Sequence, residues 1–356
     1  MNRNKGPRQV SWQRVSLLTL CALLALILFV MLFATAYVHH LLSLVTGGDN
    51  SSIHETLSSE DIATMATDPD YDPNNTLPTM NPTDIPTYPI YSQPVEDLQV
   101  EGVVNIMLIG EDRRPGEKRQ RSDSMMLCSI NTKTNKITMI SFLRDTYIPK
   151  IPGYWADKLN APYAYGGVNC LNQTLAAYFG VHVDATVVVQ FDGFTSIIDM
   201  LGGVDIELTK KEVNHLKSNA NIYGNSWDLK VGMNHLNGEQ ALAYSRIRKI
   251  DMDAMRAQRQ RKVLTALINA YKNKPVGEML TIASEILQKG YIQTDMTSNE
   301  VLSYVSKLFP MLATATINSQ QIPAEGTYES VNVGNVTATK VCDFEVNRKI
   351  LQKIFQ

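Results

Sequence analysis

The longest apolar stretch of the chain lies near its N-terminus. From Val15 to Val38 there is no charged residue, and Leu17–Phe33 is almost wholly aliphatic. A helix rises 1.5 Å per residue, so about 20 residues cover the roughly 30 Å hydrocarbon core of a bilayer. A soluble helix of this length normally carries a polar face, and this segment carries none. The pattern predicts a transmembrane helix over residues 15–38.

The charges beside this segment predict its orientation. Residues 1–14 contain four basic residues and no acid, and the next basic residue is Arg113. Positive charge favours the cytoplasmic side, so we expect a cytoplasmic tail, a single-pass anchor in the cell membrane and an extracytoplasmic remainder. The alternative is a cleaved signal peptide ending near Ala34-x-Ala36, although the apolar run is longer than a usual signal core.

Residues 39–99 have a different character, rich in Asp, Ser, Thr, Asn and Pro. Between residues 15 and 100 there are ten acids and no Lys or Arg. Few apolar residues recur at any period, which is typical of an extended or disordered spacer. We therefore expect an acidic stalk over 39–99, with a short helix possible within 53–66.

The pattern changes again at residue 100, where short apolar runs alternate with amphipathic segments. The continuous apolar run at 103–110 ends in Gly, as a buried strand would. Further strands are expected at 124–131, 136–142 and 185–191, and helices at 169–179, 193–201, 254–272 and 345–355. The segment 313–343 is strand-like and is expected to close the sheet. Residues 100–356 are thus predicted to be one α/β domain with a central mixed sheet and helices on both faces.

Composition and motifs exclude several classes of function. The net charge of −2 argues against a protein that coats nucleic acid. No C-x-x-C occurs among the four Cys, although one disulfide among Cys128, Cys170 and Cys342 is possible in an exported domain. The chain lacks G-x-x-x-x-G-K-[ST], G-x-S-x-G and H-E-x-x-H, so P-loop, common hydrolase and zincin chemistries have no support.

Acids and arginines gather where the expected strands end. Ligands bind at such strand ends in open α/β sheets. Arg makes bidentate contacts with phosphate, and Asp supplies the oxygen ligands that Mg²⁺ prefers. The candidates are Asp112, Arg114, Arg121, Asp123 and Arg144 beside the first strands, Arg246 and Arg248 on one side of an extended stretch, and Arg256, Arg259 and Gln260 at helical spacing. They predict a polyanion bound with a divalent cation; ordinary ion pairs and a solvated helix face are the alternative.

Six segments in order resemble the LytR-CpsA-Psr family of cell-envelope proteins. They are NIMLIGEDRR (105–114), RSDSMMLCSIN (121–131), SFLRDTYIPKIPGYWADKLNAPYAYGG (141–167), GFTSIIDMLGGVDI (193–206), LNGEQALAYSRIR (236–248) and MRAQRQ (255–260). The resemblance implies an extracytoplasmic phosphotransferase. Its donor would be a teichoic acid or capsule-type glycopolymer on undecaprenyl pyrophosphate, its acceptor a peptidoglycan hydroxyl, and its released product undecaprenyl phosphate.

The family's motifs assign roles to residues of this chain. Asp112 and Asp123 match Mg²⁺ ligands, and with Arg144 they form the implied catalytic group. The implied pyrophosphate-binding residues are Arg121, Arg144, Arg246, Arg248, Arg256 and Gln260, with Arg114 beside them, and Asp253 and Arg259 are supporting residues. Two departures affect the loops: Leu143 stands where the family usually has Pro, and the usual acidic Gly-Asp-Phe stretch is reduced to Met252-Asp253-Ala254.

A lipid donor requires an apolar tunnel. The expected lining is Val187, Val189, Ile197, Leu201, Val263, Leu264 and Leu267, and ordinary core packing is the alternative for each. Three other functions remain open: a polyprenyl pyrophosphate hydrolase that uses water as acceptor, a regulator of envelope genes, and a lipid-binding scaffold. A cytoplasmic tail of about 14 residues cannot itself read DNA, so no direct nucleic-acid binding is expected and any regulatory effect must be indirect.

Overall fold

The structure is a computed structural model of the chain. It describes residues 51–58, 62, 77–85, 98–111, 119–218, 227–247, 250–251, 253–275, 278, 281–282, 285–286, 288–297, 299–301, 303–304, 308, 311 and 314–356. The predicted tail and transmembrane segment lie outside these residues, as do Asp112, Arg114 and Arg248. Within the described part of the chain, no helix combines the length and the apolar character needed to cross a membrane.

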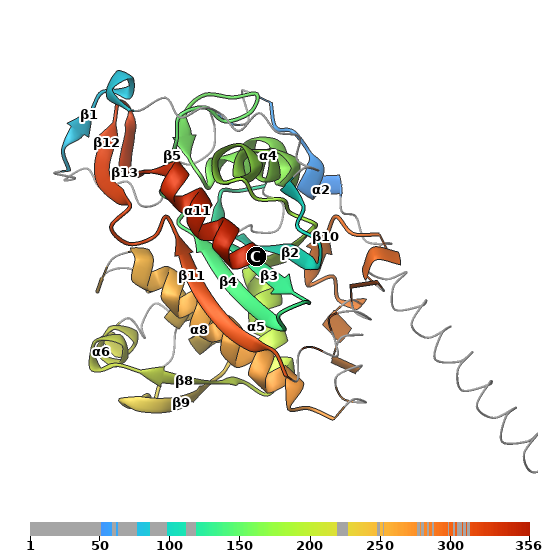
Figure 1. The fold of residues 1–356 in the computed structure, drawn as a ribbon. Helices are drawn as coiled ribbons and strands as arrows, with labels where there is room; N and C mark the ends of the chain where they lie inside the picture. The colour runs from blue at the N-terminus through green and yellow to red at the C-terminus, as the bar shows by residue number, and fades with distance from the viewer. Residues whose placement is uncertain are drawn as a thin grey trace, which may run out of the picture.

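A six-stranded mixed sheet forms the centre of the domain (Figure 1), in the order β10-β7-β2-β3-β4-β11. The strands are β2 (Val103–Glu111), β3 (Ser122–Asn131), β4 (Lys136–Phe142), β7 (Ala185–Gln190), β10 (Ile292–Thr294) and β11 (Thr316–Ile322). β7 runs parallel to β2 and β11 runs parallel to β4, while the other neighbours are antiparallel. The predicted α/β class with a central mixed sheet is confirmed.

One face of the sheet is covered by α4 (Ala161–Phe179) and α11 (Phe344–Phe355). α4 is interrupted by non-helical backbone at Gly166 and Gly167, and the part that follows this kink matches the helix expected over 169–179. It ends at Gly180, whose φ of 63° lies in the left-handed region that favours glycine at a helix C-terminus. Side chains of both helices pack with Met107, Leu127 and Val188 of the strands in the largest apolar cluster. This face is a continuous buried core.

The other face is covered by α5 (Phe191–Met200), α7 (Gly238–Ser245) and α8 (Asp253–Lys272). Beyond these helices lie α6 (Lys210–Ser218) and a two-stranded antiparallel unit, β8 (Val204–Leu208) with β9 (Gly232–Leu236). β8 alternates buried and exposed side chains, so it turns one face towards a second, smaller core that includes Val263 of α8. The sequence pattern did not predict α6, β8 or β9.

A third sheet corrects two expectations. The strands β12 (Tyr328–Val333) and β13 (Val336–Cys342) pair with β1 (Thr79–Met80) instead of the central sheet. Within segment 313–343, therefore, only β11 joins the central sheet. β1 and the 3-10 turn η1 (Pro82–Asp84) lie in the expected stalk, and so does α2 (Ser51–His54). β5 (Tyr147–Ile148) and β6 (Asp157–Lys158) form a short separate pair.

The described part of the expected stalk is therefore packed on the domain. Ile53 is fully buried in the main core, and Leu57 lies in the same cluster. The buried Arg119 side chain donates hydrogen bonds to the backbone carbonyls of Ser52 at 2.7 Å, Glu55, Tyr163 at 2.6 Å and Ala164 at 3.1 Å. An extended spacer cannot describe residues 51–58, because this arginine fastens them to α4.

Candidate functional site

A β-bulge positions Asp123, the one of the two predicted metal-binding carboxylates that lies among the described residues. In the pairing of β2 with β3, Gly110 lies opposite Ser124, and Glu111 lies opposite Ser122. Asp123 is therefore the extra residue of β3. A bulge of this kind re-aims a side chain at the end of a ladder. Asp123 and Ser124 both line a cavity on the α5 and α8 side of the sheet.

Asp123 is held by Arg144, which follows β4. Nη1 of Arg144 donates to Oδ1 of Asp123 at 3.2 Å, and the arginine side chain is 4% exposed. Asp145 lies on the other side of the same guanidinium, 3.9 Å from Nε, and it also faces Nζ of Lys158 at 3.4 Å. The sequence expected Arg144 and Asp123 to converge, and the structure brings them into direct contact.

Arg121 is bound to a different set of partners. Its two terminal nitrogens contact the two oxygens of Asp157 at 3.2 and 2.8 Å, and Nη1 contacts Asn160 at 3.4 Å. The Tyr165 hydroxyl lies 3.2 Å from Nη2 and donates to Asp157. Burial and the negative charge of Asp157 raise the pKa of Tyr165. Asp157 and Tyr165 were not predicted, and the segment that contains them showed no periodic signal.

The cavity has a volume of about 250 Å³ and lies between the sheet, α5, α7 and α8. Its polar lining consists of Asp123, Ser124, Ser245, Arg246, Arg256 and Gln260. The remainder is apolar and comes from Leu108, Ile109, Gly110, Met126, Val189, Phe191, Phe194, Ile197, Leu242, Leu264 and Leu267. The lining thus combines charged groups with a larger apolar wall, which suits a ligand that has an anionic head and an apolar tail.

Four of the predicted lipid-pocket residues line this cavity: Val189, Ile197, Leu264 and Leu267. Val187, Leu201 and Val263 are not among its lining side chains. Val263 is fully buried in the second core, and Leu201 is 4% exposed, so core packing describes both. Phe191 and Phe194 were missed, although they share the helical spacing of Ile197 at intervals of three.

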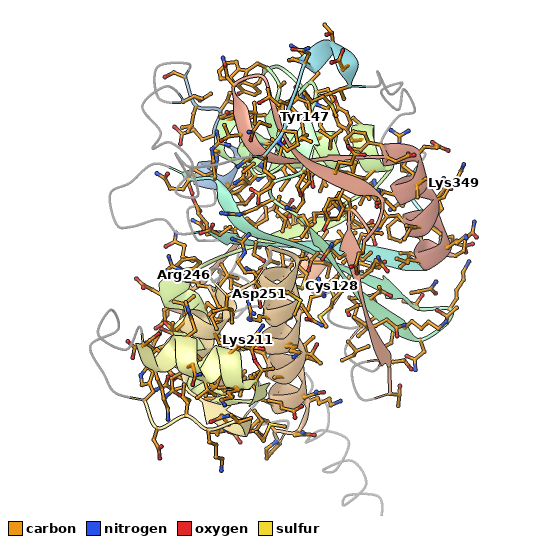
Figure 2. The ribbon with its side chains drawn as sticks, turned by 90° about the vertical axis from the view of Figure 1, so that its left-hand side faces the viewer. Cys128, Tyr147, Lys211, Arg246, Asp251 and Lys349 are labelled. Atoms are coloured by element: carbon orange, nitrogen blue, oxygen red, sulfur yellow. The ribbon has the colours of Figure 1, made fainter. Side chains whose placement is uncertain are left out.

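Arg246 reaches the cavity from the end of α7. The sequence analysis placed it in an extended stretch, but its φ of −97° and ψ of −1° are helical, and its N–H bonds back to α7 carbonyls. Its guanidinium lies over the Phe191 ring, 4.6 Å from the centroid. Figure 2 shows Arg246 and Asp251 near the same end of α8, across the sheet from Tyr147 and Lys349.

α8 presents two of its predicted residues to the cavity. Arg256, which is 4% exposed, and Gln260 both line it, and the Ser124 hydroxyl donates to Oε1 of Gln260 at 3.1 Å. The hydrogen bond places Gln260, the last residue of the MRAQRQ segment, directly beside β3. The backbone of Asp253 begins the helix.

Arg259 has a structural role on another side of α8. Its Nε donates to Glu212 of α6 at 2.8 Å, Nη1 donates to the Ile247 carbonyl at 3.1 Å, and Nη2 contacts Asp251. Burial alone would raise the pKa of Glu212, but hydrogen bonds from Thr209 and Arg259 outweigh it and hold that pKa below its usual value. Arg259 therefore fixes α8 to α6 and to the loop after α7.

Cys128, Cys170 and Cys342 are free thiols, which resolves the disulfide question that the sequence left open. Burial raises the pKa of Cys128 to about 12 and the pKa of Cys170 to about 11. Burial raises the pKa of Cys342 as well. None of the three is placed as a nucleophile.

The donor set at the cavity accommodates a magnesium ion only with help from a substrate. Among the described residues there is no group of three or more His, Cys, Asp or Glu side chains that could hold a metal. Mg²⁺ often uses one or two carboxylates together with substrate phosphates and water, so Asp123 fits this mode. Asp112, the second predicted ligand, lies outside the described residues.

Fold and cavity together define an α/β domain with one face of its sheet opened into a site for amphipathic anions. The model of the LytR_cpsA_psr family matches residues 69–353. The chain therefore belongs to the LytR-CpsA-Psr family. The match begins within the segment expected to be a stalk, consistent with the packing of β1 on the domain.

Known relatives are similar over most of their own length. The polyisoprenyl-teichoic acid–peptidoglycan teichoic acid transferase TagU of Bacillus mycoides (strain KBAB4) is 34% identical over 231 residues, covering 63% of this chain and 69% of that protein. The structure of TagT bound to LI-WTA is 26% identical, with a TM-score of 0.58 over 72% of this chain and 90% of TagT. A structure of the family protein YwtF (TagT) with bound octaprenyl pyrophosphate lipid has 25% identity and a TM-score of 0.53, over 71% and 90% of the two chains.

Proposed function

We propose that this protein is a phosphotransferase that moves a glycopolymer from a polyprenyl pyrophosphate carrier to peptidoglycan. The observation that carries the proposal is the lining of the 250 Å³ cavity, where Asp123, Arg246 and Arg256 meet a wall of aliphatic and aromatic side chains. A pyrophosphate head and a prenyl tail have this same division of charge and apolar surface. The polymer is of the teichoic acid or capsule type.

Two relatives support this assignment. TagU carries a name that states transfer of teichoic acid to peptidoglycan, and YwtF (TagT) holds an octaprenyl pyrophosphate lipid. The present chain shares the fold with both the TagT structures and spans most of their length. Its residues Asp123, Arg144, Arg246, Arg256 and Gln260 lie together at one end of the sheet, as the head group of such a lipid requires.

The arginines supply positive charge and orientation in this proposal. Arg246 and Arg256 would bind the phosphate oxygens from α7 and α8, and buried Arg144 would hold Asp123 in place as well as contact the head group. Arg121, held in place by Asp157, would add positive charge beside the head group. Phosphoryl transfer depends mainly on positioning and on charge stabilisation, so a rigid set of guanidinium groups suits the reaction.

The proposed reaction exchanges one oxygen for another on the phosphorus that carries the polymer. A peptidoglycan hydroxyl attacks this phosphorus, the new P–O bond forms, and the bond to the bridging oxygen of the pyrophosphate breaks. Polyprenyl phosphate leaves, and the hydroxyl proton passes to a carboxylate, for which Asp123 and Asp112 are the two candidates. Mg²⁺, held by Asp123 and Asp112, would neutralise charge on the pyrophosphate when bound.

The proposed location follows from the sequence. We place the N-terminal tail in the cytoplasm, the anchor over residues 15–38 in the membrane and the domain outside it, where peptidoglycan is available. The carrier lipid and the acceptor would then both lie on the outer side of the same bilayer. A protease added to intact spheroplasts should digest the domain if this placement is right.

Product analysis tests the activity. The full chain in detergent is incubated with Mg²⁺, a lipid-linked oligosaccharide and uncrosslinked peptidoglycan strands, and the products are separated. We expect oligosaccharide joined to the strands through a phosphodiester, with release of polyprenyl phosphate. Free oligosaccharide phosphate in place of the joined product would show that water is the acceptor and that the protein is a hydrolase. Lipid binding with no turnover would indicate a scaffold.

A pair of matched variants tests whether the cavity holds the lipid. Val189→Phe adds bulk to a side chain that lines the cavity, and Val231→Phe adds the same bulk at an exposed position. We expect the first to weaken binding of octaprenyl pyrophosphate about tenfold or more and the second to leave it unchanged, because a filled cavity cannot accept the tail. Equal lipid affinity in both variants would contradict the assignment.

A further inference from the structure

A second cavity lies against α8, away from the one described above. It has a volume of about 620 Å³ and is bounded by α8, β8 and Ser319 of β11. Arg256, Gln260, Leu264 and Leu267 face the first cavity, whereas Arg261, Thr265 and Asn269 face the second. The two sets of side chains lie on different sides of the helix, so α8 separates two different cavities.

Arg261 is the unusual residue of this second cavity. It is 9% exposed, and among the described residues its Nε and Nη1 atoms have no hydrogen-bond partner. Arg261 also makes no ion pair within the described part of the chain, and burial lowers its pKa. A buried guanidinium is costly unless its charge and its donors are satisfied. An anion bound in the cavity would provide both through a bidentate contact.

The remaining lining indicates what carries that anion. Gln258, Asn269 and Asn273 offer amide groups, and Thr265 and Ser319 offer hydroxyls, so the wall can donate to and accept from several ligand hydroxyls. Lys262 adds a second positive charge. The opposite wall holds Asp205 and Glu207, and Asp205 is already paired with His235 at 2.8 Å. These acids disfavour a ligand with several negative charges, and they favour a ligand that has a single negative charge and many hydroxyl groups.

We propose that the cavity around Arg261 binds a polyhydroxylated ligand bearing a single phosphate or carboxylate group, such as one repeat of an anionic glycan. The guanidinium of Arg261 contacts the anionic group, and the amide and hydroxyl side chains of α8 contact the ligand's hydroxyls. This inference does not depend on the proposed transfer reaction, because binding is measured without turnover. Two sources offer such chemistry: a phosphodiester-linked polyol and a carboxylated sugar.

Calorimetric titration of the full chain in detergent tests the proposal with small probes. The phosphodiester probe is bis(glycerol) phosphate, the carboxylate probe is N-acetylmuramic acid, and glycerol and N-acetylglucosamine are the neutral controls. We expect saturable binding of at least one anionic probe, and the probe that binds identifies the source. Absence of saturable binding for both anions, or equal binding of the neutral controls, would overturn the proposal.

Variants assign any binding to this cavity. Arg261→Met removes the charge and keeps most of the apolar stem, and it should weaken binding about ten- to hundredfold. Arg261→Lys, which keeps the charge and loses the planar fork, should weaken it less and replaces the first variant if that one does not fold. Lys272→Met, an exposed position on the same helix, is the control. Binding that survives both Arg261 variants but is lost in Asp123→Asn would belong to the first cavity and would refute the inference.

Discussion

The two faces of the central sheet both carry apolar side chains, but the packing against them differs: one face is a solid core and the other borders a cavity. On the α4 and α11 face, Met107, Leu127 and Val188 are at most 1% exposed and lie in one continuous cluster. On the α5 and α8 face, Leu108 and Val189 line a cavity instead. Successive residues of a strand point to opposite faces, so neighbours in sequence have these different environments.

The helices on the two faces are also held differently. α11 packs through residues such as Leu351 and Phe355 in the main core. α8 is fixed near its N-terminal end by Arg259, which binds Glu212 and Asp251. Arg259 lies on another side of α8 from the cavity, and Val263 packs the same helix into the second core. α8 is therefore held by contacts that lie outside the cavity, namely the second core and the ion pairs of Arg259.

The largest expected effect comes from removing the charge of Asp123 on the cavity face. Asp123→Asn should lower the transfer rate about 10²–10³-fold, because a proposed Mg²⁺ ligand and candidate proton acceptor is lost. Steady-state formation of the joined product measures the change. Asp228→Asn alters an exposed aspartate and should leave the rate unchanged.

The melting temperature of Asp123→Asn must be compared as well, because this variant removes a negative charge that faces buried Arg144. An unchanged transfer rate in a folded Asp123→Asn protein would favour the scaffold or an indirect regulatory role over an enzyme. A lost rate together with a lost fold would be uninformative for Asp123 itself, and Gln260→Ala, which lines the same cavity, then provides the second test.

The packing difference between the faces predicts unequal costs for the same substitution. Leu127→Ala, in the solid core, should lower the free energy of unfolding by about 2–5 kcal/mol. Leu264→Ala, beside the existing cavity, should cost about 2 kcal/mol or less, because its side chain is already partly without neighbours. Denaturant unfolding of both variants measures the costs, and equal values would mean that the two faces are equally well packed.

The ion pairs of Arg259 predict a pH-dependent effect. Glu212 has a folded-state pKa below its usual 4.5. Its ionised form therefore stabilises the fold above about pH 4.5, and this contribution is lost as the pH falls through the lowered value. Glu212→Gln should cost about 1.5–3 kcal/mol near neutral pH, because Arg259 loses a charged partner. The difference from wild type should shrink on acidification.

The chain provides a closely matched control for this variant. Glu300 makes the same hydrogen bonds with Thr297 that Glu212 makes with Thr209, at 2.8 Å to the backbone N–H in both cases. Glu300 is exposed, and within the described part of the chain it makes no ion pair with an arginine. Glu300→Gln should change stability by less than about 0.5 kcal/mol. Equal costs for the two variants would show that Arg259 contributes nothing.

The smallest expected effect is that of a reductant. Cys170 and Cys342 lie in the solid core, Cys128 lies on the opposite face, and all three are free. Reduction should leave the melting temperature of the domain unchanged. Iodoacetamide should label these thiols slowly in the folded protein, since their pKa values are raised. A lower melting temperature after reduction would reveal a bond that the structure lacks.

Much of the fold was predictable because strand and helix periods are local properties. The runs at 103–110 and 136–142 and the helix at 254–272 were placed within a few residues. α6 was missed, although Thr209-x-x-Glu212 is a capping-box signal that announces a helix. That signal would also have placed Glu212, the partner of Arg259.

The candidate site was less predictable for two physical reasons. The apolar run that contains Val187, Val188 and Val189 predicts a buried strand. Whether a face of that strand is fully packed or borders a cavity depends on helices that are distant in sequence. Register is the second reason: the bulge that turns Asp123 into the cavity arises from pairing with β2, which no local pattern encodes. Motif resemblance supplied what local physics could not.

The anchoring of residues 51–58 by Arg119 limits how far the domain can lie from a membrane-spanning segment at residues 15–38. If residues 15–38 span the bilayer, residues 39–50 connect that span to the anchored segment, and a chain of 12 residues reaches about 40 Å at most when fully extended. A stalk that continued to residue 99 would have allowed several times that radius. On that condition, the domain would act within this distance of the lipid surface, where the proposed carrier lies, and the acceptor strands of peptidoglycan would have to reach the same zone.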